Sequence, residues 1–165
     1  MNYSQLNPYS VVDGPGVRTS LYVSGCTLHC KGCHNQKAWD FNFGQEYTTK
    51  ETELILKCLE LKYVSGLSLL GGEIFDQDPS LLLDLVKKVK EKYPKKDIWA
   101  WTGYEFEEIK NKELLNYIDV IVCGKFEIDK RDISSNNKWR GSTNQYIVDV
   151  KSSLNSNELI LYKEN

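Results

Sequence analysis

Short apolar runs alternate with longer amphipathic stretches along this chain of 165 residues. The short runs are rich in β-branched and aromatic residues, which is typical of buried strands. From these runs we expect strands at residues 17–23, 66–70, 97–101 and 118–122, with further candidates at 145–150 and 159–162. The stretches between them have apolar residues at helical spacing, and we expect helices at 49–62, 79–92 and 105–115. Thr49 is expected to cap the first of these helices.

Strands that alternate with helices predict βαβ units and a mainly parallel sheet. The units are too few for a closed eight-stranded barrel, which takes about 250 residues. We therefore expect a single α/β domain over residues 1–165, folded as an open partial (βα) barrel with a curved sheet. Ligand sites in such sheets lie at the carboxyl ends of the strands. Four loops fall there: the loop after the first strand, Gly71-Gly72-Glu73, Thr102-Gly103 and Cys123-Gly124-Lys125.

The composition is that of an ordinary globular protein, with 41% hydrophobic and 27% charged residues. The net charge is −2 and no basic block occurs, so we do not expect a nucleic-acid partner. The apolar runs are too short to span a membrane. Residues 1–5 lack the charged and apolar regions of a signal peptide, and a cytoplasmic location is the resulting expectation.

Three of the five cysteines, Cys26, Cys30 and Cys33, lie in one loop with the spacing C-x3-C-x2-C. Thiolates select zinc or iron–sulfur clusters. Three protein ligands on a four-iron cluster leave one iron open, and an open iron can bind a substrate. The alternative is a zinc-stabilised binding module that uses His29 or His34 as fourth ligand. Structural zinc sites usually pair ligands from two separated knuckles, whereas all candidates here lie in a single loop.

The cysteine motif, followed by Gly71-Gly72-Glu73 at the end of the second expected strand, resembles the radical S-adenosylmethionine superfamily. The run from Asp13 to Arg18, and His34-Asn35 with Trp39, resemble the activating enzymes of glycyl-radical enzymes. Three further runs extend the resemblance to the family that activates anaerobic (class III) ribonucleoside-triphosphate reductase, over roughly residues 1 to 148. They are Trp99 to Tyr104, Gly124-Lys125-Phe126 and Trp139 to Gln145.

This resemblance implies that Cys26, Cys30 and Cys33 hold a [4Fe–4S] cluster and that S-adenosyl-L-methionine chelates the open iron. One electron then cleaves the sulfonium to methionine and a 5′-deoxyadenosyl radical. That radical takes a hydrogen atom from a glycine of the partner, the large glycyl-radical subunit of the reductase. The implied electron donor is a reduced flavodoxin or a ferredoxin-like protein. The stored radical resides on the partner, and no side chain of this chain is expected to be catalytic.

Candidate cofactor-binding residues follow from the strand ends. Gly71 and Gly72 allow the chain to bend around the methionine moiety, and either Glu73 or the two glycine carbonyls would accept hydrogen bonds from its amino group. Thr102 and Gly103 are expected to contact the cofactor, since a glycine at a strand end admits a ligand. Lys125 is within expected reach of a carboxylate.

Two other enzyme classes stay open at this point. One is an activase of another glycyl-radical enzyme, of the formate-lyase type, and the other is a small deazapurine-forming radical enzyme that acts on a free metabolite.

Cys123 departs from the family pattern, which usually has an aspartate before Gly124-Lys125. A thiol does not replace a carboxylate as a polar partner unless it is ionised.

Overall fold

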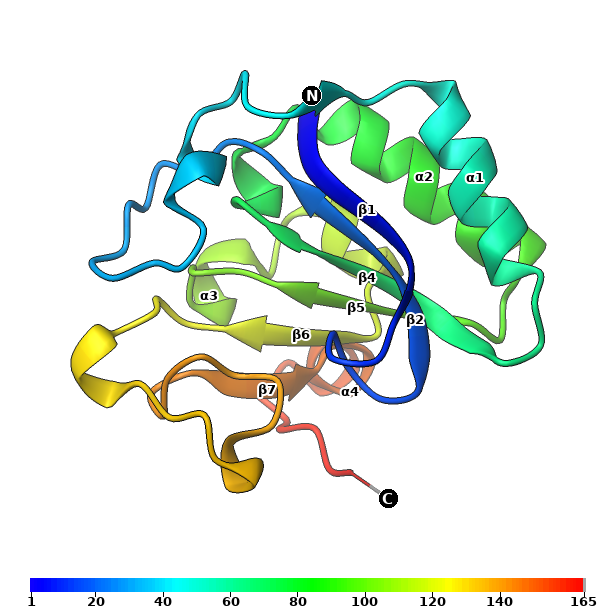
Figure 1. The fold of residues 1–165 in the computed structure, drawn as a ribbon. Helices are drawn as coiled ribbons and strands as arrows, with labels where there is room; N and C mark the ends of the chain where they lie inside the picture. Colours follow the sequence, from blue (N-terminus) through cyan, green and yellow to red (C-terminus); the bar gives the residue numbers. More distant parts are fainter. Residues whose placement is uncertain (165) are drawn as a thin grey trace.

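Seven strands form one mixed sheet within residues 1–164, the part of the chain that the computed structural model describes (Figure 1). The strand order across the sheet is β3-β1-β2-β4-β5-β6-β7. The strands span Asn2–Ser10 (β1), Val17–Val23 (β2), Gln45–Glu46 (β3), Val64–Gly71 (β4), Asp97–Trp101 (β5), Val120–Cys123 (β6) and Tyr146–Asp149 (β7).

Four α-helices accompany the sheet in the described part of the chain. They span Thr49–Leu59 (α1), Pro79–Lys92 (α2), Phe106–Ile109 (α3) and Val150–Ser156 (α4). Helix α1 packs on β1, β2 and β4, and α4 packs on β6 and β7. Helices α1 and α2 lie on the same side of the sheet (Figure 1). None of the helices in residues 1–164 is long and apolar enough to cross a membrane.

The predicted elements compare well with the observed ones in the centre of the sheet. Strands β2 and β5 and helix α2 have the predicted bounds, and β4, β6 and β7 differ by a few residues. The cap of α1 is Thr48 rather than Thr49, because Thr48 and Glu51 form a reciprocal capping box. The single helix expected at 105–115 is instead the short α3 followed by a 3₁₀ turn, Glu113–Tyr117.

The predicted open partial (βα) barrel with a mainly parallel sheet is wrong. Among the described strands, β2, β4, β5 and β6 pair in parallel, whereas β1 pairs antiparallel with β2 and β3, and β7 pairs antiparallel with β6. A parallel pairing needs a crossover, usually a helix. Residues 124–145 contain 3₁₀ turns and an isolated bridge but no α-helix, and the chain returns beside β6 in the opposite direction.

Three further differences from the prediction concern β1, α4 and residues 159–162. Strand β1 is rich in polar residues and contains Pro8, so its apolar pattern is weak. Helix α4 follows β7 directly and consists mainly of polar residues after its first position. The strand expected at 159–162 is reduced to a single antiparallel bridge between Leu161 and Val148.

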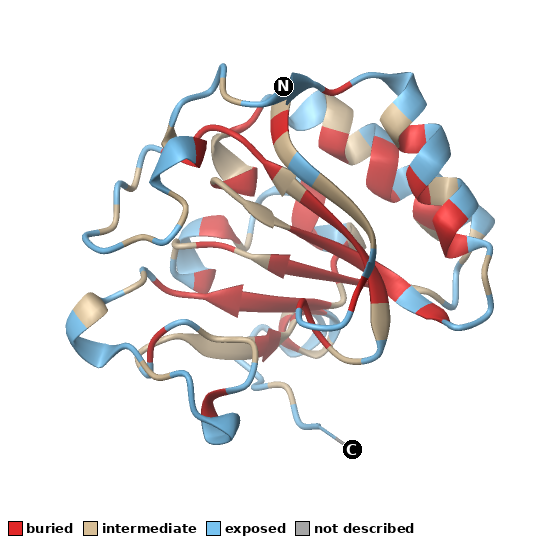
Figure 2. Ribbon diagram, in the orientation of Figure 1, coloured by how far each residue is buried: buried red, intermediate tan, exposed pale blue. Residues whose placement is uncertain are grey.

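The hydrophobic core lies between the sheet and its helices. Most residues of the central strands are buried (Figure 2), and those that face the apolar sides of α1 and α2 form this core. Leu67 and Leu69 of β4 and Ile98 of β5 belong to this set. Because side chains alternate across a strand, the residues between them point to the opposite face. That second face carries the polar network and the cavity described below.

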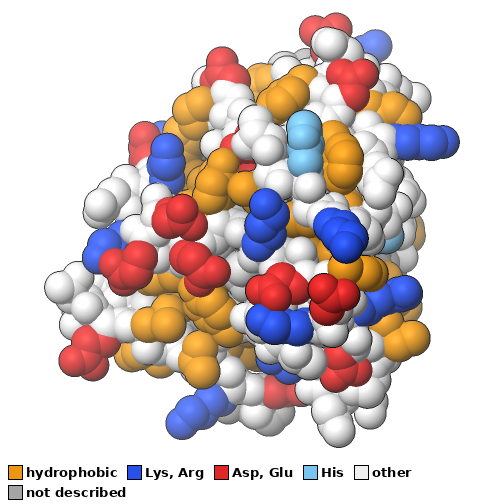
Figure 3. Space-filling view, turned by 90° about the vertical axis from the view of Figure 1, so that its left-hand side faces the viewer, with side chains coloured by type: hydrophobic (Ala, Val, Ile, Leu, Met, Phe, Trp, Pro, Cys, Tyr) orange, Lys and Arg blue, Asp and Glu red, His pale blue; other side chains and the backbone are white. Residues whose placement is uncertain are grey.

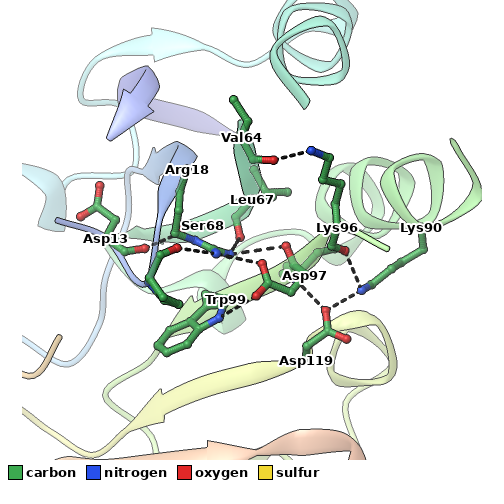
Figure 4. A network of polar contacts seen from close by, with 12 residues as sticks. Asp13, Arg18, Val64, Leu67, Ser68, Lys90, Lys96, Asp97, Trp99 and Asp119 are labelled. Carbon is green, nitrogen blue, oxygen red and sulfur yellow. Dashed lines mark hydrogen bonds and ion pairs between the residues drawn. The ribbon is translucent and has the colours of Figure 1, made fainter. Parts of the chain in front are cut away.

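Arg18 is fully buried on the second face, near the amino ends of the parallel strands. Its guanidinium lies 2.8 Å from Asp97 Oδ1 and donates to Ser68 Oγ at 2.7 Å (Figure 4). It also donates to the Leu67 carbonyl and stacks over Trp99, 5.6 Å from the ring centroid. Arg18 therefore forms a buried ion pair with a carboxylate at the amino ends of the parallel strands.

Replacing Asp97 with alanine is expected to lower the free energy of unfolding by about 2 kcal/mol, because it leaves a buried guanidinium without its counter-ion. The loss is smaller than for a fully buried pair, since the Asp97 side chain is 38% exposed and Arg18 keeps its bonds to Ser68 and Leu67. Asp84→Ala is the matched control, because it breaks an exposed pair with Lys88. Urea unfolding of both variants measures the difference, and equal losses would contradict a structural role for the buried pair.

Candidate functional site

The cysteine-containing loop follows β2 and closes on itself through backbone hydrogen bonds. The Gly25 amide donates to the Ala38 carbonyl at 2.8 Å, and the Cys26 amide donates to the Trp39 carbonyl at 3.2 Å. The His29 ring stacks on the Trp39 ring with 4.6 Å between the centroids. The loop is therefore anchored at its base, and its three thiols project from a defined backbone.

A cavity of about 800 Å³, including its part open to solvent, lies at the carboxyl ends of β2, β4 and β5. Eight of the nine residues predicted for the site line it: Cys26, Cys30, Cys33, Gly71, Gly72, Glu73, Thr102 and Gly103. The structure thus brings together loops that are widely separated in the sequence.

Lys125 is the ninth predicted residue, and it is exposed rather than part of the cavity wall. Burial raises the pKa of the Cys30 thiol, and the Phe126 amide and the positive charge of Lys125 act in the opposite direction. Burial likewise raises the pKa of Cys26. Both thiols are protonated at neutral pH when free, so binding iron would release their protons. Lys125 acts on the site through its charge near Cys30.

The glycine pair after β4 packs directly on the start of the cysteine-containing loop. Gly71 has a φ of +113°, and a Cβ built there would lie 2.5 Å from the Val23 carbonyl oxygen. The Gly72 amide donates to the same oxygen at 2.7 Å. A Cβ on Gly72 would lie 2.4 Å from the Gly25 carbonyl oxygen. Only glycine fits this close approach of two backbones.

Glu73 is 1% exposed and joins the loops after β4 and β5. Its carboxylate accepts hydrogen bonds from Thr102 Oγ1 and the Gly103 amide, both at 2.8 Å, and from the Phe75 amide at 3.2 Å. Burial raises the pKa of Glu73 to about 7, although these donors oppose the shift. Because its oxygens already have protein donors, Glu73 has less acceptor capacity left for a ligand than the sequence suggested.

Several cavity-lining residues were not singled out as site residues from the sequence. Tyr22 and Leu70 line the cavity and are neighbours across β2 and β4. Trp101 lines it from the end of β5, and strand alternation places it on the same face as Trp99. This alternation is the signal that would have found them. Phe126 and Gln145 line the cavity from later loops, and no periodicity marks them.

The stretch from Trp139 to Gln145 folds over the second face of the sheet beside the cavity. Trp101 Nε1 donates to the Trp139 carbonyl at 2.7 Å, and the Trp139 ring packs edge-on against Trp99. Gln145 Nε2 donates to the Gly124 carbonyl at 2.9 Å. This stretch therefore forms part of the wall that closes the sheet next to the cavity.

Cys123 is fully buried in the hydrophobic core and does not line the cavity. Burial raises the pKa of its thiol, with the charges of Glu105 and Glu73 acting in the same direction. Cys58 is a buried residue of α1 and does not line the cavity either. These two cysteines behave as small apolar side chains.

In residues 1–164, no three His, Cys, Asp or Glu side chains come close enough to hold one metal ion. A four-iron cluster binds each thiolate at a different iron, so its ligands lie farther apart than those of a single ion. Three thiols around one cavity therefore fit a cluster better than one zinc ion.

On this side of the molecule, charges of both signs are mixed with hydrophobic side chains (Figure 3).

Comparisons with known proteins agree with this donor set. A family described as "4Fe-4S single cluster domain" matches residues 12–148. Three similar proteins carry the name anaerobic ribonucleoside-triphosphate reductase-activating protein. The one from Enterobacteria phage T4 is 42% identical over 88% of this chain and 92% of its own length. Those from Pasteurella multocida and Vibrio cholerae are 44% and 45% identical, each over 89% of this chain and 96% and 97% of their own lengths.

Proposed function

Because the chain belongs to the family of anaerobic ribonucleoside-triphosphate reductase-activating proteins and contains a 4Fe-4S single cluster domain, we propose that it activates such a reductase. The proposed reaction is the reductive cleavage of S-adenosyl-L-methionine, followed by removal of a hydrogen atom from a glycine of the reductase. The observation that carries this proposal is the cavity shared by Cys26, Cys30, Cys33 and the glycine pair Gly71-Gly72. Residues 1–165 would act as a single domain.

Cys26, Cys30 and Cys33 would hold a [4Fe–4S] cluster in this proposal. When bound and reduced, such a cluster supplies the electron for the cleavage and an open iron for the amino and carboxylate groups of S-adenosyl-L-methionine. The thiols are the chemically suitable donors, and the Phe126 amide near Cys30 would favour its thiolate form. The electron donor would be a reduced flavodoxin or a ferredoxin-like protein.

The remaining residues around the cavity would bind and orient the second cofactor. The carbonyls of Gly71 and Gly72 would accept hydrogen bonds from its amino group, and Gly103 would leave room for it at the end of β5. Glu73 would hold Thr102 and Gly103 in place through its hydrogen bonds to both. Trp101 and Phe126 would limit the access of water to the cavity. A carbon radical requires such a dry site, because it reacts with almost any neighbouring group.

The decisive experiment uses the full chain, prepared without oxygen and supplied with iron, sulfide and a reductant. We expect methionine and 5′-deoxyadenosine from S-adenosyl-L-methionine, and a glycyl doublet in the electron paramagnetic resonance spectrum when the anaerobic reductase is added. A formate-lyase type enzyme serves as the comparison partner. A glycyl doublet on that enzyme alone would identify it, and not the reductase, as the partner of this chain. Colourless protein that contains one zinc and no iron would overturn it.

A further inference from the structure

Asp76 connects three of the loops around the cavity although it does not line the cavity itself. It ends the 3₁₀ turn Ile74–Asp76, directly after the glycine pair and Glu73. Its side chain accepts three hydrogen bonds from groups that are far away in the sequence. Neither the cysteine motif nor the glycine motif includes this residue.

One carboxylate oxygen of Asp76 is directed at the cysteine-containing loop. Oδ2 accepts from the Thr27 amide at 2.7 Å and from Thr27 Oγ1 at 2.8 Å. Thr27 directly follows Cys26 and is exposed, and these two bonds hold its turn against the loop after β4. Gln77 Nε2 adds a second side-chain link, because it donates to the Gly25 carbonyl at 3.0 Å. A charged acceptor makes such bonds stronger than a neutral one would.

The other oxygen is directed at the loop after β5. Oδ1 accepts from the Tyr104 hydroxyl at 2.7 Å, and this bond is the main reason that the pKa of Tyr104 is raised. The phenol therefore stays protonated and remains a donor at neutral pH. Tyr104 directly follows Gly103, whose amide is bound to Glu73. Asp76 thus links the strand-end loops of β2, β4 and β5.

We propose that Asp76 is a positioning residue that fixes the first cluster ligand, Cys26, through its bonds to Thr27 and Tyr104. The inference rests on the proposed function, since it assumes that Cys26 binds iron. Residues that hold a ligand in place commonly contribute about 10- to 100-fold to the affinity for a metal. Asp76 would contribute in this way without touching the cluster or S-adenosyl-L-methionine.

The test compares the release of iron to a chelator from anaerobically reconstituted wild-type protein and three variants. We expect Asp76→Asn to lose iron about tenfold faster, because an amide has one acceptor oxygen and no charge and so cannot accept from both Thr27 and Tyr104. Thr27→Val should change the rate in the same direction and by less, since it keeps the backbone bond and the charge of Asp76. Asp78→Asn is the matched control, because Asp78 only caps α2 at Ser80. Thermal unfolding of the iron-free proteins checks that the fold is kept.

Equal iron release from Asp76→Asn and Asp78→Asn would overturn the positioning role. If Asp76→Asn fails to fold, Thr27→Val decides the question alone, and a wild-type release rate in that variant overturns the link through Thr27. A changed resonance spectrum of the reduced cluster in Asp76→Asn, with unchanged stability of the iron-free protein, supports the proposal. Wild-type protein that binds no cluster would overturn the proposed function together with this inference, so the two failures are distinguishable.

Discussion

Cys30→Ala is expected to abolish both the cluster and all radical formation. The Cys30 thiol lines the cavity between Cys26 and Cys33 in the loop and lies near the Phe126 amide and Lys125. Residues that only hold a metal ligand in place contribute about 10- to 100-fold to metal affinity or activity. Removal of a direct ligand should lower the affinity by at least as much. The measurements are iron and sulfide content, S-adenosyl-L-methionine cleavage, and the glycyl doublet on the reductase.

Two other cysteines provide matched controls for this experiment. Cys58→Ala and Cys123→Ala make the same chemical change at buried positions away from the cavity. We expect both variants to keep the cluster, although the lost packing lowers stability by about 1 kcal/mol in each case. Full activity of Cys30→Ala would contradict the assignment of Cys30 as a cluster ligand. Loss of the cluster from Cys123→Ala would give that thiol a role that its position in the core does not suggest.

The central strands were predictable because both of their faces are covered. Strands β2 and β5 consist mostly of apolar and β-branched residues, and their bounds follow from the sequence alone. The carboxyl ends of parallel neighbours meet at one edge, which is why the cysteine-containing loop and Gly71-Gly72 were expected to lie together. Their assembly around one cavity agrees with that expectation, whereas their roles toward cofactors remain predictions.

The edges of the sheet were not predictable in the same way. Strand β1 has a polar sequence, and its place beside β2 depends on pairing across the hairpin rather than on its own periodicity. The direction of β7 depends on the path of residues 124–145, which is set by contacts such as the bond from Gln145 to Gly124. Local patterns contain no information about such contacts, so a parallel arrangement was assumed and was wrong.

The hydrogen-bond partners of side chains inside the site could not be predicted from the sequence either. Glu73 was considered as an acceptor for a ligand, yet in the structure its oxygens accept hydrogen bonds from Thr102, Gly103 and Phe75. Lys125 was placed correctly at a strand end, but its exposed side chain does not line the cavity. Strand alternation fixes the face on which a strand residue lies, whereas the direction of a loop side chain depends on tertiary packing.

Gly71→Ala is expected to be the most damaging substitution that leaves all three cysteines in place. The residue has a φ of +113°, and its new Cβ would lie 2.5 Å and 2.6 Å from the carbonyl oxygen and the amide nitrogen of Val23. Backbone strain of this kind costs about 1–3 kcal/mol, and the forced contact adds a comparable amount. We expect the free energy of unfolding to fall by about 3–5 kcal/mol, as measured by urea unfolding, with loss of S-adenosyl-L-methionine cleavage.

Gly124→Ala and Gly72→Ala separate the two causes of this loss. Gly124 has a similar φ of +106°, but its added Cβ would meet no atom closer than 3.5 Å, so only the strain remains. A Cβ on Gly72 would lie 2.4 Å from the Gly25 carbonyl oxygen, which adds a contact without a positive φ. Because Gly25 directly precedes Cys26, Gly72→Ala should weaken iron binding more than Gly124→Ala does. If Gly71→Ala is no less stable than Gly124→Ala, the backbones of β2 and β4 do not approach as closely as the structure requires.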